Sequence, residues 1–224
     1  MKSKQSVTIQ SPAGLIFDMD GVLVDSEPLH KRAKELAFSE IGIVLSDSVY
    51  DSYKGRPDAT MLPEILTARG FPTERIEELS RRKRQIYEGI EHDLHAVDGA
   101  PDFVRWAASR YKIALATSAT ARNREATLSL LGIGELFHGV VDASGHQRPK
   151  PDPEVFLIAL EKLSLKAADC WIIEDSLNGL RAAKAAGCFA AAITTTFDKN
   201  MLVTAGADIV VDSFAQLRTL LESA

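Results

Sequence analysis

Two aspartates, Asp18 and Asp20, stand at the end of an apolar run that begins at Leu15. In an extended segment, residues two apart point to the same side, so both carboxylates can face one site at the mouth of a buried strand. A carboxylate pair of this kind can hold a magnesium ion, or it can divide nucleophilic and acid–base work between its two members. A strand that ends in a solvated turn shows the same pattern, so the pair needs further support.

Further polar groups come directly after, or shortly before, predicted elements of regular structure. They are Thr117 with Ser118, Glu174 with Asp175, and Lys150. Each has an ordinary explanation when taken alone: turn chemistry for Thr117, a solvated loop for Lys150, and a helix N-cap for the acidic pair. In open α/β sheets, however, ligands bind in the crevice outside the carboxyl ends of the strands. We therefore expect these groups to converge with the two aspartates on one site.

Short apolar runs that alternate with helical stretches predict the elements that position these groups. The expected strands are 14–17, 113–116, 140–141, 171–173, 189–193 and 209–211, and the expected helices are 101–110, 122–131, 153–163, 177–186 and 214–221. Near-continuous apolar strands separated by helices indicate a parallel sheet that is covered on both faces. The predicted fold class is therefore α/β.

The segment 28–96 differs from the rest, because it contains no clear strand and its apolar residues recur at helical spacing. We interpret it as a helical domain inserted after the first strand, with the α/β core formed by 1–27 and 97–224. The simplest role for such an insertion is a cap over the carboxyl edge of the sheet. Lys83 lies in the middle of the apolar stripe of the helix expected at 73–91, so its ammonium either reaches solvent along its own stem or faces the cleft.

Composition and charge exclude several classes of protein. The chain has 224 residues, of which 46% are hydrophobic, and a formal net charge of −5. A general nucleic-acid binder would carry a basic face, so we expect no nucleic-acid partner. We see no signal peptide and no apolar run long enough to span a bilayer, and therefore expect a cytoplasmic protein without a membrane partner. We expect a monomer or a weak dimer.

Together the motifs resemble the four motifs of the haloacid dehalogenase (HAD) superfamily. The matching segments are Asp18-x-Asp20-Gly-Val, Thr117-Ser118 after an apolar run, Lys150-Pro, and Glu174-Asp175-Ser-x-x-Gly179. The segment from Asp25 to His30 and the helical insertion are similar to the subfamily that includes β-phosphoglucomutase and many sugar-phosphate phosphatases. The resemblance implies a Rossmann-like parallel-sheet core with a helical cap inserted after the first strand.

The resemblance also implies catalytic roles. Asp18 is the nucleophile that forms an aspartyl-phosphate, and Asp20 is the general acid and base. Thr117 and Lys150 bind the transferring phosphoryl group, and Ser118 offers its backbone amide to it. Such an arrangement suits phosphoryl transfer, in which catalysis consists mostly of positioning and electrostatic stabilisation.

Mg²⁺ is the cofactor that the resemblance implies. Asp18 and Asp175 are its direct ligands, the backbone carbonyl of Asp20 also ligates it, and Glu174 binds the metal or one of its waters. Carboxylate and carbonyl oxygens are the hard ligands that this ion prefers.

Within the insertion, Lys83 and His30 fall where related caps place a substrate-facing lysine and a hinge histidine. Related mutases carry an arginine three residues after the glycine of a Lys-Gly turn, but here Asp58 stands at that place and is interpreted as a helix N-cap. Arg56 replaces the missing cation only if the loop turns differently. The sequence therefore favours a magnesium-dependent phosphatase for a small sugar or polyol phosphate over a hexose-phosphate mutase.

Two other classes of protein remain as alternatives. A metal-dependent glycosyltransferase can also use two aspartates spaced two apart, but it would not need Thr117, Lys150 or the acidic pair. A non-catalytic binding protein that kept the fold would be favoured by loss of the nucleophile or the lysine, and neither is lost. The sequence does not identify the substrate.

Overall fold

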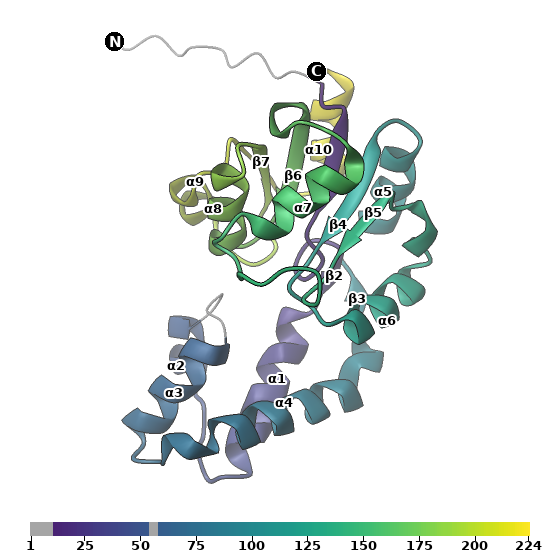
Figure 1. Ribbon diagram of the computed structural model, residues 1–224. Coiled ribbons are helices and arrows are strands. Elements are labelled where there is room, and N and C mark those ends of the chain that lie inside the picture. Colours follow the sequence, from purple (N-terminus) through teal and green to yellow (C-terminus); the bar gives the residue numbers. More distant parts are fainter. Residues whose placement is uncertain (1–10, 54–57) are drawn as a thin grey trace, which may run out of the picture. The chain divides into compact units, whose positions relative to one another are not determined.

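The computed structural model describes residues 11–53 and 58–224, and the chain divides into two compact units (Figure 1). We call Met1–Val24 with Ala96–Ala224 the core, and Asp25–His95 the helical insert. The insert thus begins three residues earlier than the predicted 28–96 and ends one residue before it. Inside the core, the backbone N–H of Val97 donates a hydrogen bond of 3.0 Å to the carbonyl of Leu23, at the point where the chain leaves and re-enters this unit.

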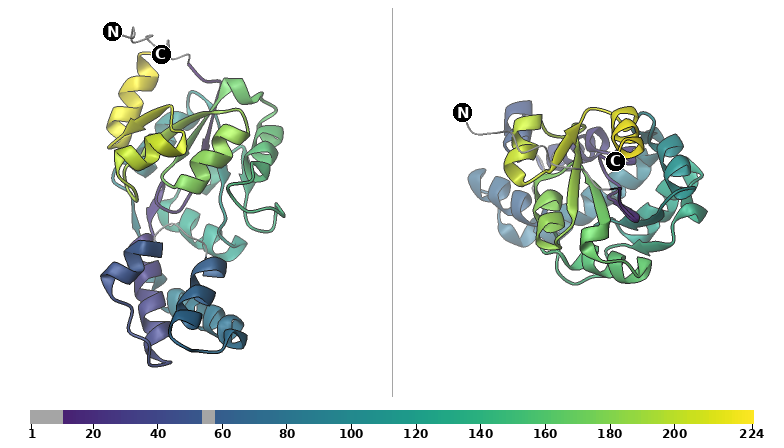
Figure 2. Two further views of the ribbon diagram at one scale, coloured as in Figure 1. Left: turned by 90° about the vertical axis from the view of Figure 1, so that its left-hand side faces the viewer. Right: turned by 90° about the horizontal axis from the view of Figure 1, so that it is seen from above.

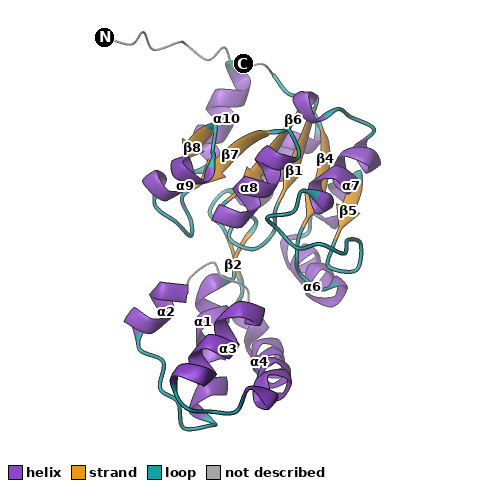
Figure 3. Ribbon diagram, turned by 60° about the vertical axis from the view of Figure 1, so that its left-hand side comes forward, coloured by secondary structure: helices purple, strands orange, loops and turns teal. Residues whose placement is uncertain are grey.

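A parallel six-stranded sheet forms the centre of the core (Figure 3). Its strands are β1 (Gly14–Phe17), β4 (Lys112–Ala116), β5 (Gly139–Val141), β6 (Cys170–Glu174), β7 (Phe189–Ile193) and β8 (Ile209–Val211). The order across the sheet is β5-β4-β1-β6-β7-β8, and every pairing is parallel. The predicted α/β fold with a parallel sheet is confirmed.

Helices lie on both faces of this sheet (Figure 2). They are α5 (Ala100–Ala108), α6 (Ala121–Leu131), α7 (Glu154–Leu163), α8 (Leu177–Ala185), α9 (Lys199–Ala205) and α10 (Phe214–Glu222), with short 3₁₀ turns at Gly134–Leu136 and Ala167–Asp169. The five predicted helices are present, with shifted ends. Helix α9 was not predicted, because its seven residues span too few turns to show a clear periodicity; its N-cap, Asp198, accepts hydrogen bonds from two backbone amides.

Alternation along β1 divides its side chains between the two faces of the sheet. Ile16 belongs to a buried cluster that includes Phe156 of α7 and Leu180 of α8. The ring of Phe17, on the opposite face, packs edge-on against Phe103 and Phe137. Burial on both faces holds β1 rigidly and fixes where its carboxyl end points.

The helical insert has a small apolar core of its own. It contains α1 (Glu27–Ser39), α2 (Asp47–Tyr53), α3 (Asp58–Ala68) and α4 (Ile76–Ile90), with 3₁₀ turns at Thr73–Arg75 and Glu91–Asp93. The helix predicted at 73–91 is therefore a 3₁₀ turn followed by α4. The short strands β2 (Val24–Asp25) and β3 (His95–Ala96) pair with each other. None of the helices within 11–53 and 58–224 has the length and apolar character that a bilayer span requires.

Candidate active site

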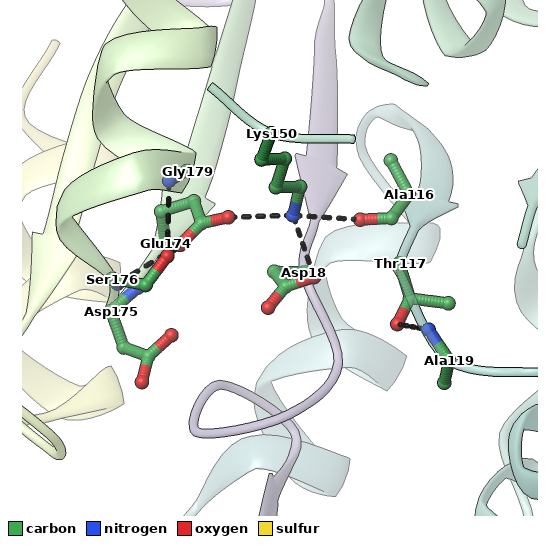
Figure 4. A network of polar contacts seen from close by, with 9 residues as sticks. All are labelled: Asp18, Ala116, Thr117, Ala119, Lys150, Glu174, Asp175, Ser176 and Gly179. Atoms are coloured by element: carbon green, nitrogen blue, oxygen red, sulfur yellow. Dashed lines mark hydrogen bonds and ion pairs between the residues drawn. The ribbon is translucent and has the colours of Figure 1, made fainter. Parts of the chain in front are cut away.

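The parallel strands end at one edge of the sheet, and polar side chains follow three of them there (Figure 4). Asp18 comes directly after β1, Thr117 directly after β4, and Glu174 is the last residue of β6. The register of β1 against β4 and β6 brings these residues to the same level. Lys150 reaches the same place from the loop between β5 and α7. Residues far apart in the sequence therefore meet at one edge, as expected for an open α/β sheet.

Lys150 lies at the centre of this group. Its Nζ is 2.8 Å from Oδ1 of Asp18 and 2.7 Å from Oε1 of Glu174, and it also donates to the backbone carbonyl of Ala116 at 3.3 Å. Burial alone would lower the pKa of this ammonium, but the two carboxylates raise it above its ordinary value. Lys150 is therefore a fixed positive charge at neutral pH.

Glu174 is completely buried and uses both carboxylate oxygens. While Oε1 contacts Lys150, Oε2 accepts hydrogen bonds from the backbone amides of Asp175 and Ser176 and from the Ser176 hydroxyl, at 2.9–3.1 Å. Ser176 is also the N-cap of α8, where its hydroxyl accepts from the amide of Gly179. The helix is thus capped by Ser176 and not by the acidic pair, and Ser176 connects the cap to the charged group through its hydrogen bonds to Glu174.

Gly179→Ala is expected to displace the Glu174 carboxylate. A Cβ on residue 179 would lie 1.8 Å from Oε1 of Glu174, far inside any allowed contact. We expect the free energy of unfolding to fall by about 3 kcal/mol, since a buried charge loses its partners. Urea denaturation, followed by tryptophan fluorescence, measures this change in the free energy of unfolding. Gly89→Ala is the control, because Gly89 is also helical but has open space at the Cβ position; it should change the value by less than about 1 kcal/mol. Equal effects of the two substitutions would contradict this account.

Three buried carboxylates, those of Asp18, Glu174 and Asp175, have oxygens within 4.8 Å of one another. Burial raises the pKa of Asp18 to about 7; Lys150 opposes this rise. Burial likewise holds the pKa of Asp175 well above its ordinary value, and the negative charges of Glu174 and Asp18 act in the same direction. Three ionised carboxylates facing a single ammonium would carry excess negative charge, and a divalent cation with a preference for oxygen ligands would neutralise it.

Asp20 lies in the turn after β1 and is partly exposed. Its side chain is not one of the three that form the buried carboxylate cluster, although its charge contributes to the raised pKa of Asp18. The turn is stabilised by the backbone N–H of Gly21, which donates to the carbonyl of Val24 at 2.7 Å. Asp20 therefore stands beside the cluster and is partly exposed.

Thr117 is fully buried, whereas its neighbour Ser118 is exposed. The hydroxyl oxygen of Thr117 accepts a hydrogen bond of 3.0 Å from the backbone amide of Ala119. An accepting hydroxyl keeps its own proton to donate, so Thr117 can donate to an anionic oxygen at the sheet edge.

In the helical insert, the buried side chain of Lys83 does not reach solvent along its stem. Its Nζ is 2.9 Å from Oδ2 of Asp58 and 3.4 Å from Nδ1 of His30. Lys34 contacts the other oxygen of Asp58 at 3.3 Å. Burial alone would raise the pKa of Asp58, but the two lysines hold it below its ordinary value. The described contacts of this carboxylate are thus ion pairs, and Asp58 is the first residue of α3, where the N-cap was predicted. The predicted Arg56 lies outside the described residues.

Lys34 is not among the residues predicted from the sequence, although its position in the helix indicates a buried ion pair. It follows His30 by four residues in α1, and residues four apart share one face of a helix. A lysine on the buried side of an amphipathic helix indicates a partner of opposite charge, which here is Asp58.

Comparison with known proteins identifies the family. A family model described as haloacid dehalogenase-like hydrolase matches residues 12–187. The chain belongs to this family. The resemblance seen in the four motifs is thereby confirmed, and the protein is an enzyme of the HAD type, a phosphoric monoester hydrolase.

Two bacterial relatives match over nearly their whole length. The chain is 30% identical over 214 residues to the phosphorylated carbohydrates phosphatase of Thermotoga maritima, covering 93% of this chain and 98% of the relative. It is 33% identical over 211 residues to the β-phosphoglucomutase of Bacillus subtilis, covering 91% and 90%.

Other matches extend this comparison. Protein SUPPRESSOR OF QUENCHING 1, chloroplastic, of Arabidopsis thaliana is 30% identical over 239 residues, which cover 96% of this chain but only 22% of that protein. Among solved structures, a hydrolase from Pseudomonas syringae superposes with a TM-score of 0.81 at 26% identity, covering 94% of this chain and 98% of the other. The superposition with the hydrolase from Pseudomonas syringae agrees with the fold described above.

Proposed function

We propose that the protein is a magnesium-dependent phosphatase that hydrolyses a small sugar or polyol phosphate. The observation that carries the proposal is the buried carboxylate cluster of Asp18, Glu174 and Asp175, held by Lys150 at the carboxyl edge of the sheet. The family match and a relative named as a phosphatase of phosphorylated carbohydrates support it.

The residues present fit a divalent cation. Asp18 and Asp175 would hold it together with the backbone carbonyl of Asp20, and Glu174 would bind it directly or through a water. When bound, the ion neutralises negative charge on the phosphoryl oxygens and lowers the repulsion between phosphate and nucleophile. The chemistry of the donor set, all hard oxygens, favours Mg²⁺ over a soft metal.

Asp18 acts as the nucleophile in this proposal. Its carboxylate oxygen forms a bond to phosphorus while the bond from phosphorus to the substrate's oxygen breaks, and Asp20 donates a proton to that leaving oxygen. A water then attacks the phosphorus of the aspartyl-phosphate, and Asp20 accepts a proton of that water. The bond from phosphorus to the Asp18 oxygen breaks, which restores the Asp18 carboxylate and releases inorganic phosphate. The partial exposure of Asp20 is compatible with proton exchange in both steps.

Lys150 and Thr117 bind the phosphoryl group during transfer. The ammonium of Lys150 is already 2.8 Å from Asp18 and is kept charged, so it needs no reorganisation as charge develops on the transferred group. Thr117 donates its hydroxyl proton, and Ser118 contributes its backbone amide. Ser118 is exposed, which is compatible with a backbone amide that contacts the substrate from the solvent side.

A hexose-phosphate mutase is the second candidate, because the relative from Bacillus subtilis is named β-phosphoglucomutase. A mutase must hold a second phosphate with a strong cation. In the helical insert both Lys83 and Lys34 are engaged by Asp58, which reduces the positive charge available for that purpose. The same ion pairs also cancel the repulsion that an isolated Asp58 would exert, so the distinction needs a direct measurement.

Phosphorus NMR on a panel of sugar and polyol phosphates with Mg²⁺ separates the two candidates. We expect inorganic phosphate to appear at the rate at which the substrate disappears, with no need for an added sugar bisphosphate. Interconversion of hexose phosphates that requires a bisphosphate and releases almost no phosphate would establish the mutase. Absence of turnover over the whole panel, including a generic aryl phosphate, would contradict both.

Lys83→Ala is expected to impair the use of sugar phosphates more than that of small aryl phosphates. We propose that Lys83 and His30 contact the sugar part of the substrate, and a lost charged hydrogen bond costs about 10-fold to 100-fold in kcat/KM. Steady-state kinetics with both substrate types measures the ratio. Lys31→Ala, which removes a more exposed lysine of the same insert, is the control. An equal loss for both substrate types in Lys83→Ala would contradict substrate contact.

The raised pKa of Asp18 predicts how metal binding depends on pH. Without metal, this pKa is about 7 in the folded protein, above its ordinary value of 3.8, so folding stability from this group is present below about pH 4 and lost as pH rises toward 7. Mg²⁺ needs the ionised carboxylate and competes with the proton. The rise in melting temperature caused by Mg²⁺ should therefore be large at pH 8 and small at pH 5.5. Thermal denaturation across this range measures it; a rise independent of pH would contradict the assignment.

A further inference from the structure

Three consecutive threonines, Thr194, Thr195 and Thr196, follow β7 at the same edge of the core sheet. Their hydroxyls lie against three different groups. Thr194 donates to Asp212 at 2.9 Å, and Thr195 donates to the backbone carbonyl of Gly21. The hydroxyl of Thr196 lies beside the carboxylate of Asp175, because a Cβ on Gly21 would be 3.0 Å from Oγ1 of Thr196 and 1.9 Å from Oδ2 of Asp175. Two of the three thus contact the turn after β1 or the acidic cluster, and neither was singled out by sequence motifs.

Thr196 lies next to a carboxylate that Lys150 does not pair with. The ammonium of Lys150 is within hydrogen-bond distance of Asp18 and Glu174, whereas the side chain of Asp175 has the Thr196 hydroxyl beside it. Asp175 is only 4% exposed, so little water is available to orient it. A hydroxyl at this place favours one rotation of the carboxylate and leaves lone pairs of its oxygens for a cation.

Thr195 fixes the turn that carries Asp18 and Asp20. Its hydroxyl binds the carbonyl of Gly21, whose own φ of +75° only glycine adopts without strain. A Cβ on residue 21 would lie 1.9 Å from Oδ2 of Asp175, so the turn and that carboxylate are packed directly against each other. The two adjacent threonines thus lie against both partners of this close contact, Thr195 against the turn and Thr196 against the Asp175 carboxylate.

We propose that Thr195 and Thr196 are positioning residues for the divalent cation: they set the distance between the turn after β1 and Asp175, so that oxygens from both are in place before the ion binds. The inference rests on the proposed metal-dependent function. Groups that orient metal ligands without touching the metal contribute about 10-fold to 100-fold in metal affinity. Neither hydroxyl is needed for the phosphoryl-transfer steps themselves.

The test is metal binding by the full chain, measured without substrate. Mn²⁺ is titrated with electron paramagnetic resonance, and Mg²⁺ is titrated by calorimetry. Thr196→Val keeps the shape of the side chain and removes the hydroxyl; we expect it to weaken binding about 10-fold to 100-fold. Thr195→Val should weaken it in the same direction. Thr194→Val is the matched control, because it removes a neighbouring hydroxyl that binds Asp212, and it should bind like the unaltered protein.

Thr196→Ser keeps the hydroxyl and separates loss of this group from altered packing. We expect it to bind Mn²⁺ within about twofold of the unaltered protein. Equal affinity of Thr194→Val, Thr195→Val and Thr196→Val would overturn the inference, as would equal losses in Thr196→Ser and Thr196→Val. If Thr196→Val does not fold, the comparison of Thr196→Ser with Thr196→Ala decides in the same way. Failure of the unaltered protein to bind either ion would instead show that the proposed function is wrong.

Discussion

Asp18→Asn is expected to reduce kcat by about 10⁴-fold or more, as loss of a covalent nucleophile does. The amide has nearly the shape of the carboxylate, so Lys150 keeps its contact with Glu174 and the fold persists. Because the carboxyl group of Asp18 is destabilising when ionised and buried, the metal-free variant should also melt at the same temperature or higher at pH 8.

Steady-state turnover of an aryl phosphate with saturating Mg²⁺ measures the first effect. Asp102→Asn is the matched control, since the Asp102 side chain is 91% exposed and lies on α5. It should turn over like the unaltered protein. Activity of Asp18→Asn within tenfold of the control would exclude Asp18 as the nucleophile.

Lys150→Met is expected to abolish turnover and to destabilise the core. Methionine retains most of the apolar stem but leaves Asp18 and Glu174 without their shared cation. Removing one partner of a buried ion pair costs about 3–5 kcal/mol, and part of that cost is relieved here when Asp18 takes up a proton. We therefore expect a loss near the lower end of this range at pH 8 and a smaller loss at pH 5.5.

Urea denaturation at both pH values measures the change in unfolding free energy. Lys166→Met, at an exposed position of the same unit, is the control and should change it little. Added Mg²⁺ should recover part of the stability of Lys150→Met but none of its turnover, because the cation compensates the carboxylates and cannot replace the contact to the phosphoryl group. A loss of stability that is identical at both pH values would contradict the coupling between Lys150 and Asp18.

The sequence was most informative where regular structure ends. Asp18, Thr117 and Glu174 each follow or end a continuous apolar strand, and in a parallel sheet all such ends meet at one edge. The strand pattern therefore predicted both the fold and the place where these side chains gather. Their roles in phosphoryl transfer rest on the family resemblance and await the experiments above.

The sequence was least informative about contacts between separate elements. Asp58 was interpreted as a helix cap from its local context, whereas its partners Lys34 and Lys83 come from two other helices. Thr195 and Thr196 form an ordinary polar segment after β7 in the sequence, and nothing local indicates that they lie against Gly21 and Asp175. Side-chain geometry across elements depends on packing, which periodicity and spacing do not encode.

The hydrogen bond between Val97 and Leu23 marks the two ends of the insertion as neighbours inside the core. A segment whose ends already meet can change in length, sequence or even fold without pulling on the strands that flank it, since loop closure adds little strain. The buried carboxylate cluster and Lys150 all belong to the other unit. The groups proposed to carry out the chemistry and the insertion therefore belong to separate units, so that one contiguous stretch of the chain can be exchanged without altering the residues of the candidate active site.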